Sequence, residues 1–278
     1  MLGMVRVDGS LLPSEVLPVA EACGQSPDQV RSCLRRLVAE GLLVRRGAGR
    51  RTRYETTPAG LSALGATMER TRLAYLQDAA GQGWDRQWRL VAFAVPERNR
   101  SARDAFRERL LSLGGALVQG GLYVSPHPWH KDVRAEADRL GVADQVTLMT
   151  SDDLEIGGER DPRELARRLW QLDELAERYR GFVASFRHLP EELGQLRGRH
   201  ERLSDATFLP LALSMAVAFQ GCFGADPLLP PELLPRPWPG REARELTATC
   251  RRQALTLRQA HGLPPLFRLF DEAIEAIP

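Results

Sequence analysis

Apolar residues recur at helical spacing near the start of the chain. The stretch 12–23 predicts one helix, and a second is expected from Ser26 to Glu40. Ser26 is a preferred N-cap, and Gly41 supplies a natural C-terminal stop. The second helix buries one face, which carries Val30, Cys33, Leu34, Leu37 and Val38.

The opposite face of the second helix is polar and carries three arginines. Its outward positions are Gln29, Arg31, Ser32, Arg35 and Arg36. Two helices joined by a short glycine-containing turn are typical of a helix-turn-helix. Strands follow at 42–46 and 51–56 around the turn Gly47–Arg50, so the sequence predicts a winged helix.

The middle of the chain changes from helical to alternating periodicity. A linker helix at 58–80, with Leu61, Leu64, Met68 and Tyr75 along one side, precedes this change. Strands are expected at 88–95, 116–118, 122–125 and 146–150, and helices at 99–113 and 130–140. The resulting order βαββαβ is that of a ferredoxin-like fold.

The last third of the chain is predicted to be helical. A long helix spans 161–186, and an apolar helix at 208–219 is expected to form the centre of this region. The stretch 226–240 holds six prolines and is expected to cross the surface as an extended strap before a final helix at 242–261.

The sequence thus predicts an α+β protein with four parts. These are a winged-helix domain at 1–57, a linker helix at 58–83, a ferredoxin-like domain at 84–152 and a helical effector or dimerisation domain at 161–278.

Charge concentrates where the winged helix is predicted. The whole chain has a net charge of +2, whereas residues 1–56 hold nine arginines and six acids, which is 9 − 6 = +3. Five of these arginines fall between Arg45 and Arg53. Arginine forms bidentate contacts with phosphate and guanine, so this distribution favours a nucleic-acid partner.

Other chemical signals are weak. No apolar stretch reaches the length of about 20 residues that spans a bilayer, and no signal peptide is recognisable, so a cytoplasmic protein is expected. The four cysteines are far apart, which argues against disulfides or a zinc site. His127, His130 and Asp132 match no common ligand spacing, so no metal, cofactor or catalytic residue is predicted.

Three blocks of sequence resemble the PaaX family, which is named for the repressor of phenylacetic acid degradation. Residues 84–126, beginning WDRQWRLVAFAVPERN, resemble its central domain, and residues 26–60 resemble its winged helix. The stretches LARRLWQLDELAERYRGFVASF and DPLLPPELLPRPWPGREAREL resemble its C-terminal domain. The family's first domain begins with a helix ahead of residues 2–6, so this chain either starts upstream or has a shortened first helix.

The resemblance implies two further expectations. The family's central domain is similar to a small nuclease of CRISPR spacer acquisition, but Ala94 occupies the position where that nuclease has a metal-binding acid. The family also responds to aromatic acyl-CoA thioesters, which implies a small acidic effector. Residues 218–225 depart from that expectation, because they lack the basic residues that the family carries there. The alternatives are therefore a different, less charged effector or no effector.

The leading hypothesis is therefore a ligand-responsive DNA-binding regulator, a repressor acting as a homodimer on an inverted repeat in double-stranded DNA. The residues expected to contact bases are Gln29, Arg31, Ser32 and Arg35. The residues expected to contact phosphates are Arg36, Arg46, Arg50, Arg51 and Arg53. The alternatives are a metal-dependent nuclease, which Ala94 disfavours, and a protein-interaction adaptor without DNA binding.

Overall fold

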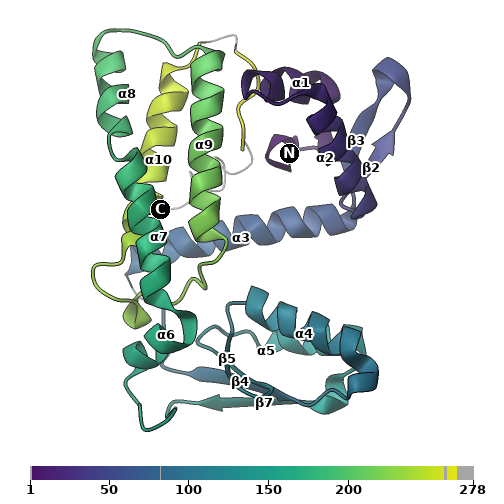
Figure 1. Cartoon of the computed structure of the whole chain (residues 1–278), viewed down its shortest axis with the longest axis vertical. Helices are drawn as coiled ribbons and strands as arrows, with labels where there is room; N and C mark the ends of the chain where they lie inside the picture. Colours follow the sequence, from purple (N-terminus) through teal and green to yellow (C-terminus); the bar gives the residue numbers. More distant parts are fainter. Residues whose placement is uncertain (1, 82, 260–261, 268–278) are drawn as a thin grey trace. The chain divides into compact units, whose positions relative to one another are not determined.

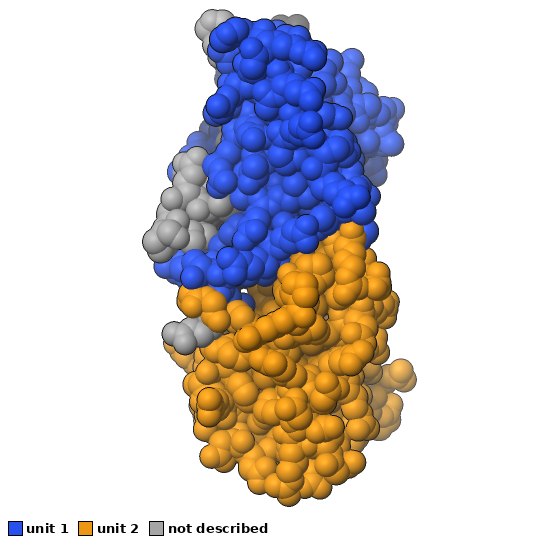
Figure 2. Space-filling model, turned by 90° about the vertical axis from the view of Figure 1, so that its left-hand side faces the viewer, with its two compact units in different colours: residues 1–79, 181–221, 241–278 blue, residues 80–180, 222–240 orange. Residues whose placement is uncertain are grey.

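The computed structural model describes residues 2–81, 83–259 and 262–267, without the side chain of Arg50. The chain forms two compact units, which Figure 2 colours separately. Unit 1 contains residues 1–79, 181–221 and 241–278, and unit 2 contains residues 80–180 and 222–240. Both units therefore draw on the C-terminal third of the sequence.

The N-terminal part of unit 1 contains a short strand, two helices and a β-hairpin (Figure 1). The elements are β1 (Ser10–Leu11), α1 (Pro13–Ala22), α2 (Pro27–Ala39), β2 (Leu43–Arg46) and β3 (Arg53–Thr56). The three strands are antiparallel in the order β1-β3-β2. A short 3-10 turn at Leu2–Met4 precedes them, and another at Gly49–Arg51 delays the start of β3 relative to its predicted position.

The helix α2 owes its position to one apolar face and two well-formed ends. Val30, Leu34 and Leu37 on this face are buried, as predicted, whereas Val38 is 36% exposed and does not belong to the buried face. The Ser26 side chain accepts a hydrogen bond from Gln29 N, and Gly41 follows the helix with a φ of 71°. This left-handed conformation favours glycine because it has no Cβ.

The long helix α3 (Pro58–Ala80) has the predicted bounds, and of the side predicted from Leu61, Leu64, Met68 and Tyr75 only Leu61 is exposed. Leu61 is 52% exposed, while Gly60, Leu64, Thr71 and Ala74 are buried. A Cβ on residue 60 would lie 2.1 Å from the Leu42 carbonyl oxygen, so only glycine allows this approach. With Gly60 against that carbonyl, its neighbour Leu61 lies on another side of the helix and is exposed.

Unit 1 also holds most of the C-terminal helices. These are α8 (Leu189–Gly198), which was not predicted, and the greater parts of α9 (Asp205–Phe223) and α10 (Pro239–Leu257). The prediction that α9 forms a buried centre was wrong, since Val217 is 63% exposed and only 28% of its most apolar window is buried.

The composition of α9 also corrects the expectation that no segment could cross a membrane. This helix has 19 residues, and its most apolar 18-residue window has a mean hydropathy of 1.6, enough for a bilayer span by length and composition alone. Helices packed inside soluble proteins meet the same criterion, so this composition does not by itself indicate a membrane protein.

Unit 2 contains a four-stranded antiparallel sheet with two helices (Figure 1). Its elements are β4 (Trp88–Phe93), α4 (Arg100–Ser112), β5 (Ala116–Gln119), β6 (Leu122–Ser125), α5 (His130–Leu140) and β7 (Val146–Ser151). They follow one another in the predicted order, and the strands lie in the sheet as β5-β6-β4-β7.

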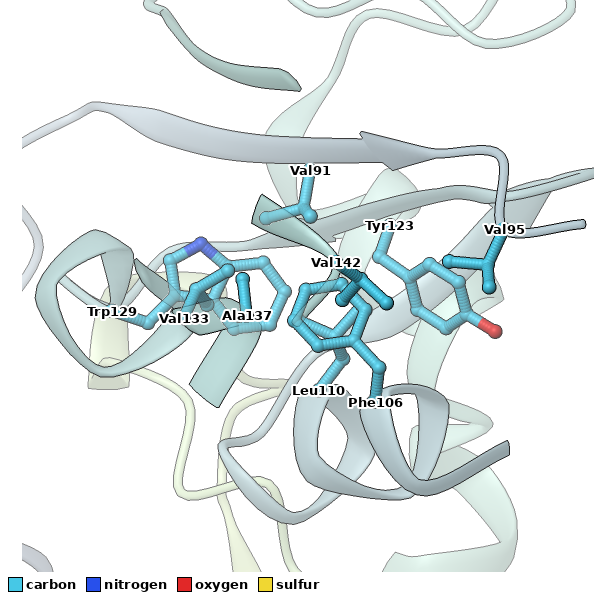
Figure 3. Close-up of a cluster of buried hydrophobic side chains, with 9 residues drawn as sticks. All are labelled: Val91, Val95, Phe106, Leu110, Tyr123, Trp129, Val133, Ala137 and Val142. Atoms are coloured by element: carbon cyan, nitrogen blue, oxygen red, sulfur yellow. The ribbon is translucent and has the colours of Figure 1, made fainter. Parts of the chain in front are cut away.

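One face of this sheet packs on α4 and α5 (Figure 3). The cluster contains Val91, Val95, Phe106, Leu110, Tyr123, Trp129, Val133, Ala137 and Val142. The Phe93 ring meets Phe106 edge-on at 5.0 Å and stacks with Tyr123 at 5.7 Å. Aromatic pairs of this kind add roughly 1 kcal/mol to the burial of their surface.

The other face of the sheet is covered by the proline-rich strap and by α6 (Pro162–Trp170). Trp88, Leu90 and Val124 project to this side, because side chains alternate along a strand. They pack with Ala166, Leu172, Leu229, Leu233 and Leu234. The prediction of a surface strap was therefore wrong, since residues 226–230 are all buried.

Polar contacts also hold the strap in place within unit 2. The Tyr179 hydroxyl donates to an Asp226 carboxylate oxygen at 2.7 Å, and the His127 Nε2 lies 3.0 Å from the Pro227 carbonyl oxygen. The Glu232 carboxylate accepts from the backbone of Gly83 and Trp84. The strap is therefore a fixed layer of the unit.

The predicted helix at 161–186 is two helices. Gln171 adopts a left-handed φ of 49° and separates α6 from α7 (Leu172–Phe186). Both helices keep the predicted apolar stripe, which includes the buried residues Leu165, Leu172 and Tyr179. The break lets α6 follow the sheet face while α7 leaves it.

A buried ion pair joins α3 to α10 within unit 1. Arg244 Nε lies 2.5 Å from Asp78 Oδ2, and Arg244 Nη2 lies 2.7 Å from Asp78 Oδ1. Their side chains are 5% and 15% exposed. Removing one member of such a pair leaves a charge without its counterpart in a low-dielectric environment.

We expect Asp78→Leu to lower the free energy of unfolding by about 3–5 kcal/mol. The double variant Asp78→Leu, Arg244→Met removes both charges and should recover much of that loss. Urea titration of both variants measures the difference. Equal destabilisation of the single and the double variant would contradict a stabilising role for the pairing itself.

Candidate nucleic-acid interface

A concave surface lies between α2 and the β2–β3 hairpin in unit 1. It encloses about 520 Å³. Its lining residues are Pro13, Leu17, Asp28, Val30, Arg31, Leu34, Arg35, Arg45, Thr52 and Tyr54. Three arginines against one aspartate make this surface, here called the arginine groove, attractive to anions.

The pairing of the hairpin decides which of its arginines face the groove. Arg45 lies opposite Tyr54 and two residues from the buried Leu43, so it shares the inner face of the sheet. Arg46 lies opposite Arg53 on the outer face, where both contact the carboxylate of Glu55 at 3.3 and 2.9 Å. The groove therefore receives Arg45, which sequence reasoning left out of the site.

The arginines differ in how far they are already engaged. Arg31 pairs with Asp28 at 2.7 Å, and Arg36 lies 3.8 Å from Glu40. Within the described ranges, no side-chain hydrogen bond or ion pair engages Arg35, Arg45 or Arg51. These three guanidinium groups can bind an incoming anion without first giving up a partner.

Two polar candidates on α2 have different environments. Ser32 is exposed on the outward side of the helix. Gln29 closes a capping box, because its Oε1 accepts from Ser26 N at 2.7 Å while Gln29 N donates to the Ser26 hydroxyl at 3.3 Å. Contact of Gln29 with a base would require this side chain to leave the box.

The structure thus brings together only part of the predicted set. Arg31 and Arg35 line the arginine groove, Ser32 and Arg36 lie beside it on α2, and Arg46, Arg51 and Arg53 lie elsewhere on the hairpin. The prediction for Arg50 lies outside the described side chains. Strand alternation counted from Leu43 would have selected Arg45 over Arg46.

Other candidate chemistry is sparse. Among the described residues, no group of three or more His, Cys, Asp or Glu side chains could hold a metal ion. Cys23, Cys33, Cys222 and Cys250, all within the described residues, form no disulfide. Burial, followed by the charge of Arg134, holds the pKa of His130 below its usual value. Ala94 lies directly after β4, where its N–H donates to the Gln145 carbonyl.

Most of the chain matches models of known protein families. Residues 81–166 match the model for the PaaX protein central Cas2-like domain, and residues 170–262 match the model for the PaaX-like protein C-terminal domain. The chain belongs to the PaaX family. The predicted resemblance is confirmed, and the two matches cover unit 2 together with the helices of unit 1 that follow it in sequence.

One curated PaaX-family relative is the transcriptional repressor PaaX of Escherichia coli (strain K12). The two sequences are 27% identical over 238 residues, which cover 86% of this chain and 72% of that repressor. A solved structure, the uncharacterized protein Rv0674 from Mycobacterium tuberculosis, aligns with a TM-score of 0.48 and 22% identity. That alignment covers 88% of this chain and 91% of the solved one.

The capping box at the start of α2 gives a prediction about stability. Ser26→Ala removes the hydroxyl that accepts from Gln29 N and should lower the free energy of unfolding by about 1 kcal/mol. Ser32→Ala, in the exposed interior of the same helix, is the matched control and should not destabilise. Chemical denaturation of both variants checks this, and equal effects would contradict the capping role.

Proposed function

We propose that this protein is a DNA-binding transcriptional regulator that reads DNA with a winged helix formed by residues 1–57. The observation that carries the proposal is the arginine groove, where Arg31 and Arg35 of α2 meet Arg45 of the hairpin. The sheet order β1-β3-β2, with two helices between β1 and β2, supports the winged-helix assignment. The repressor of E. coli supports the regulatory role.

The proposed docking places α2 in the major groove of B-DNA, which is about 12 Å wide and admits one helix. Arg31, Ser32 and Arg35 then face base edges, and Gln29 reaches a base edge when its side chain leaves the capping box. The hairpin lies against the DNA backbone. Phosphates are contacted by Arg36 of α2 and by the hairpin arginines Arg45, Arg46, Arg50, Arg51 and Arg53. The ion pairs of Arg46 and Arg53 with Glu55 are exposed and contribute little, so they can exchange for phosphate.

The proposal includes a homodimer in the cytoplasm that acts as a repressor. Two copies of α2 would enter successive major grooves about 34 Å apart, so the operator is an inverted repeat. The proposal also includes release of the protein from DNA by a ligand, which the family resemblance implies. The expected acidic thioester lacks support in residues 218–225, which contain no basic side chain.

The central part of the chain is proposed to have a ferredoxin-like fold. Its strand order β5-β6-β4-β7, with α4 and α5 packed on one face, supports this assignment. The domain serves as a scaffold in this proposal, since its largest side chains are buried in the two clusters on either side of the sheet.

Arg35→Ala and Arg45→Ala test the groove. Loss of Arg45, which is proposed to contact a phosphate, should weaken binding by roughly tenfold or more on all sequences and flatten the dependence of log K on log salt by about one unit. Loss of Arg35, which is proposed to contact a base edge, should weaken binding to the selected fragments by roughly tenfold or more and binding to unrelated DNA by less, because charged contacts contribute about 1.5–3 kcal/mol. Gel-shift titrations at several salt concentrations, on fragments selected from the source genome by the protein itself, measure both quantities.

Arg107→Ala, an exposed arginine on α4 of unit 2, is the control and should leave affinity and salt slope unchanged. Unchanged binding by both groove variants would overturn the assignment. Failure of the wild-type chain to bind any fragment in a salt-sensitive manner would favour the adaptor alternative.

Arg31→Ala tests base recognition. If Arg31 contacts a base edge, its loss should relax the preference at one base pair by about 1–3 kcal/mol while binding to unrelated DNA changes less. Selection of bound fragments with the variant, compared with wild type, reveals the position. An unchanged consensus would assign Arg31 to the backbone instead.

A further inference from the structure

A second hollow lies on the flank of α2 opposite the arginine groove. It encloses about 240 Å³ within unit 1. Its walls include Val19 and Ala20 of α1, Gln29, Val30 and Cys33 of α2, and Leu213 of α9. We call it the apolar pocket.

The chemistry of the apolar pocket selects an uncharged ligand. No charged side chain lines it among the described residues, and its polar groups are the amides of Gln25 and Gln29 and the thiols of Cys23 and Cys33. Burial raises the pKa of the Cys23 thiol, so this group stays neutral. A charged ligand would lose its hydration without gaining a counterion, which is costly.

The size of the pocket narrows the ligand further. An engineered apolar cavity of about 150 Å³ in another protein accommodates benzene. The 240 Å³ here therefore suits a molecule with one substituted ring or two fused rings. A smaller hollow among α8, α9 and α10, lined by residues that include Leu189, Met215 and Ala216, encloses only about 60 Å³ and is too small for a ring.

The position of the pocket links it to the helix proposed to read DNA. Val30, which is 3% exposed, borders both the apolar pocket and the arginine groove. Gln29 borders the pocket and also closes the capping box at the start of α2. A molecule held between Leu213 and α2 thus contacts the side chains that fix the position and the first turn of this helix.

We propose that the apolar pocket binds an uncharged aromatic small molecule, and that its occupancy changes the affinity of α2 for DNA. The ligand class rests on the pocket alone, while the coupling to DNA rests on the proposed function. A ligand shifts an equilibrium only through its different affinity for two states, so binding and DNA affinity must change each other by the same factor.

The first experiment measures binding to the full chain without DNA. The probe is prodan, an uncharged fluorophore built on two fused rings, whose emission shifts to shorter wavelengths in apolar sites. We expect saturable binding of one probe per chain. Ala20→Phe places a ring in the pocket and should weaken binding by about tenfold or more.

Two further variants keep this test decisive. Leu213→Trp fills the same pocket from its opposite wall and should have the same effect even if Ala20→Phe disturbs α1. Ala216→Phe, in the smaller hollow beside α9, is the matched control and should bind the probe as wild type does. Absence of saturable binding, or equal loss in Ala216→Phe and Ala20→Phe, overturns the site.

The second experiment measures DNA affinity with and without saturating probe on a selected genomic fragment. We expect a change of about fivefold or more, matched by an equal change in probe affinity when DNA is bound. The change should vanish in Ala20→Phe. Probe binding with no change in DNA affinity overturns the coupling. If the wild-type chain without probe does not bind DNA, the proposed function is overturned, but the probe-binding site is not.

Discussion

The burial of one face of α2 is the constraint on which the candidate site depends. Val30, Leu34 and Leu37 are each less than 10% exposed, so the helix cannot rotate without placing these side chains in water. Burying such a side chain contributes about 1.5–3 kcal/mol. These three buried side chains therefore determine which residues of α2 point outward. They also determine which residues line the arginine groove and the apolar pocket on the two flanks of the helix.

The same reasoning explains the architecture of unit 2. Alternation along β4 sends Val91 to one side of the sheet and Trp88 and Leu90 to the other, so both faces need a cover. The helices α4 and α5 cover the first face. The second is covered by α6 and the strap, which explains why a segment so rich in proline is buried: it supplies three leucines, Leu229, Leu233 and Leu234.

For the arginines, composition indicated the kind of partner, whereas strand geometry decided which of them share one surface. The clustering of arginines before residue 54 indicated an anionic partner, but it does not show which face of the hairpin each side chain occupies. Pairing with β3 separates Arg45 from its neighbour Arg46, and only the first shares a surface with Arg31 and Arg35. Neighbouring side chains in a strand point to opposite faces, so adjacent arginines have different roles.

The sequence alone determined the features that depend on residues a few positions apart. The helix start at Ser26, the stop at Gly41 and the order of strands and helices in residues 88–151 arise from local capping and periodicity, and the PaaX resemblance was confirmed by family comparison. The exposure of Leu61 on α3, the break at Gln171, the burial of the strap and the apolar pocket depend on the tertiary structure. Each of these involves packing between segments distant in sequence, which no local pattern encodes.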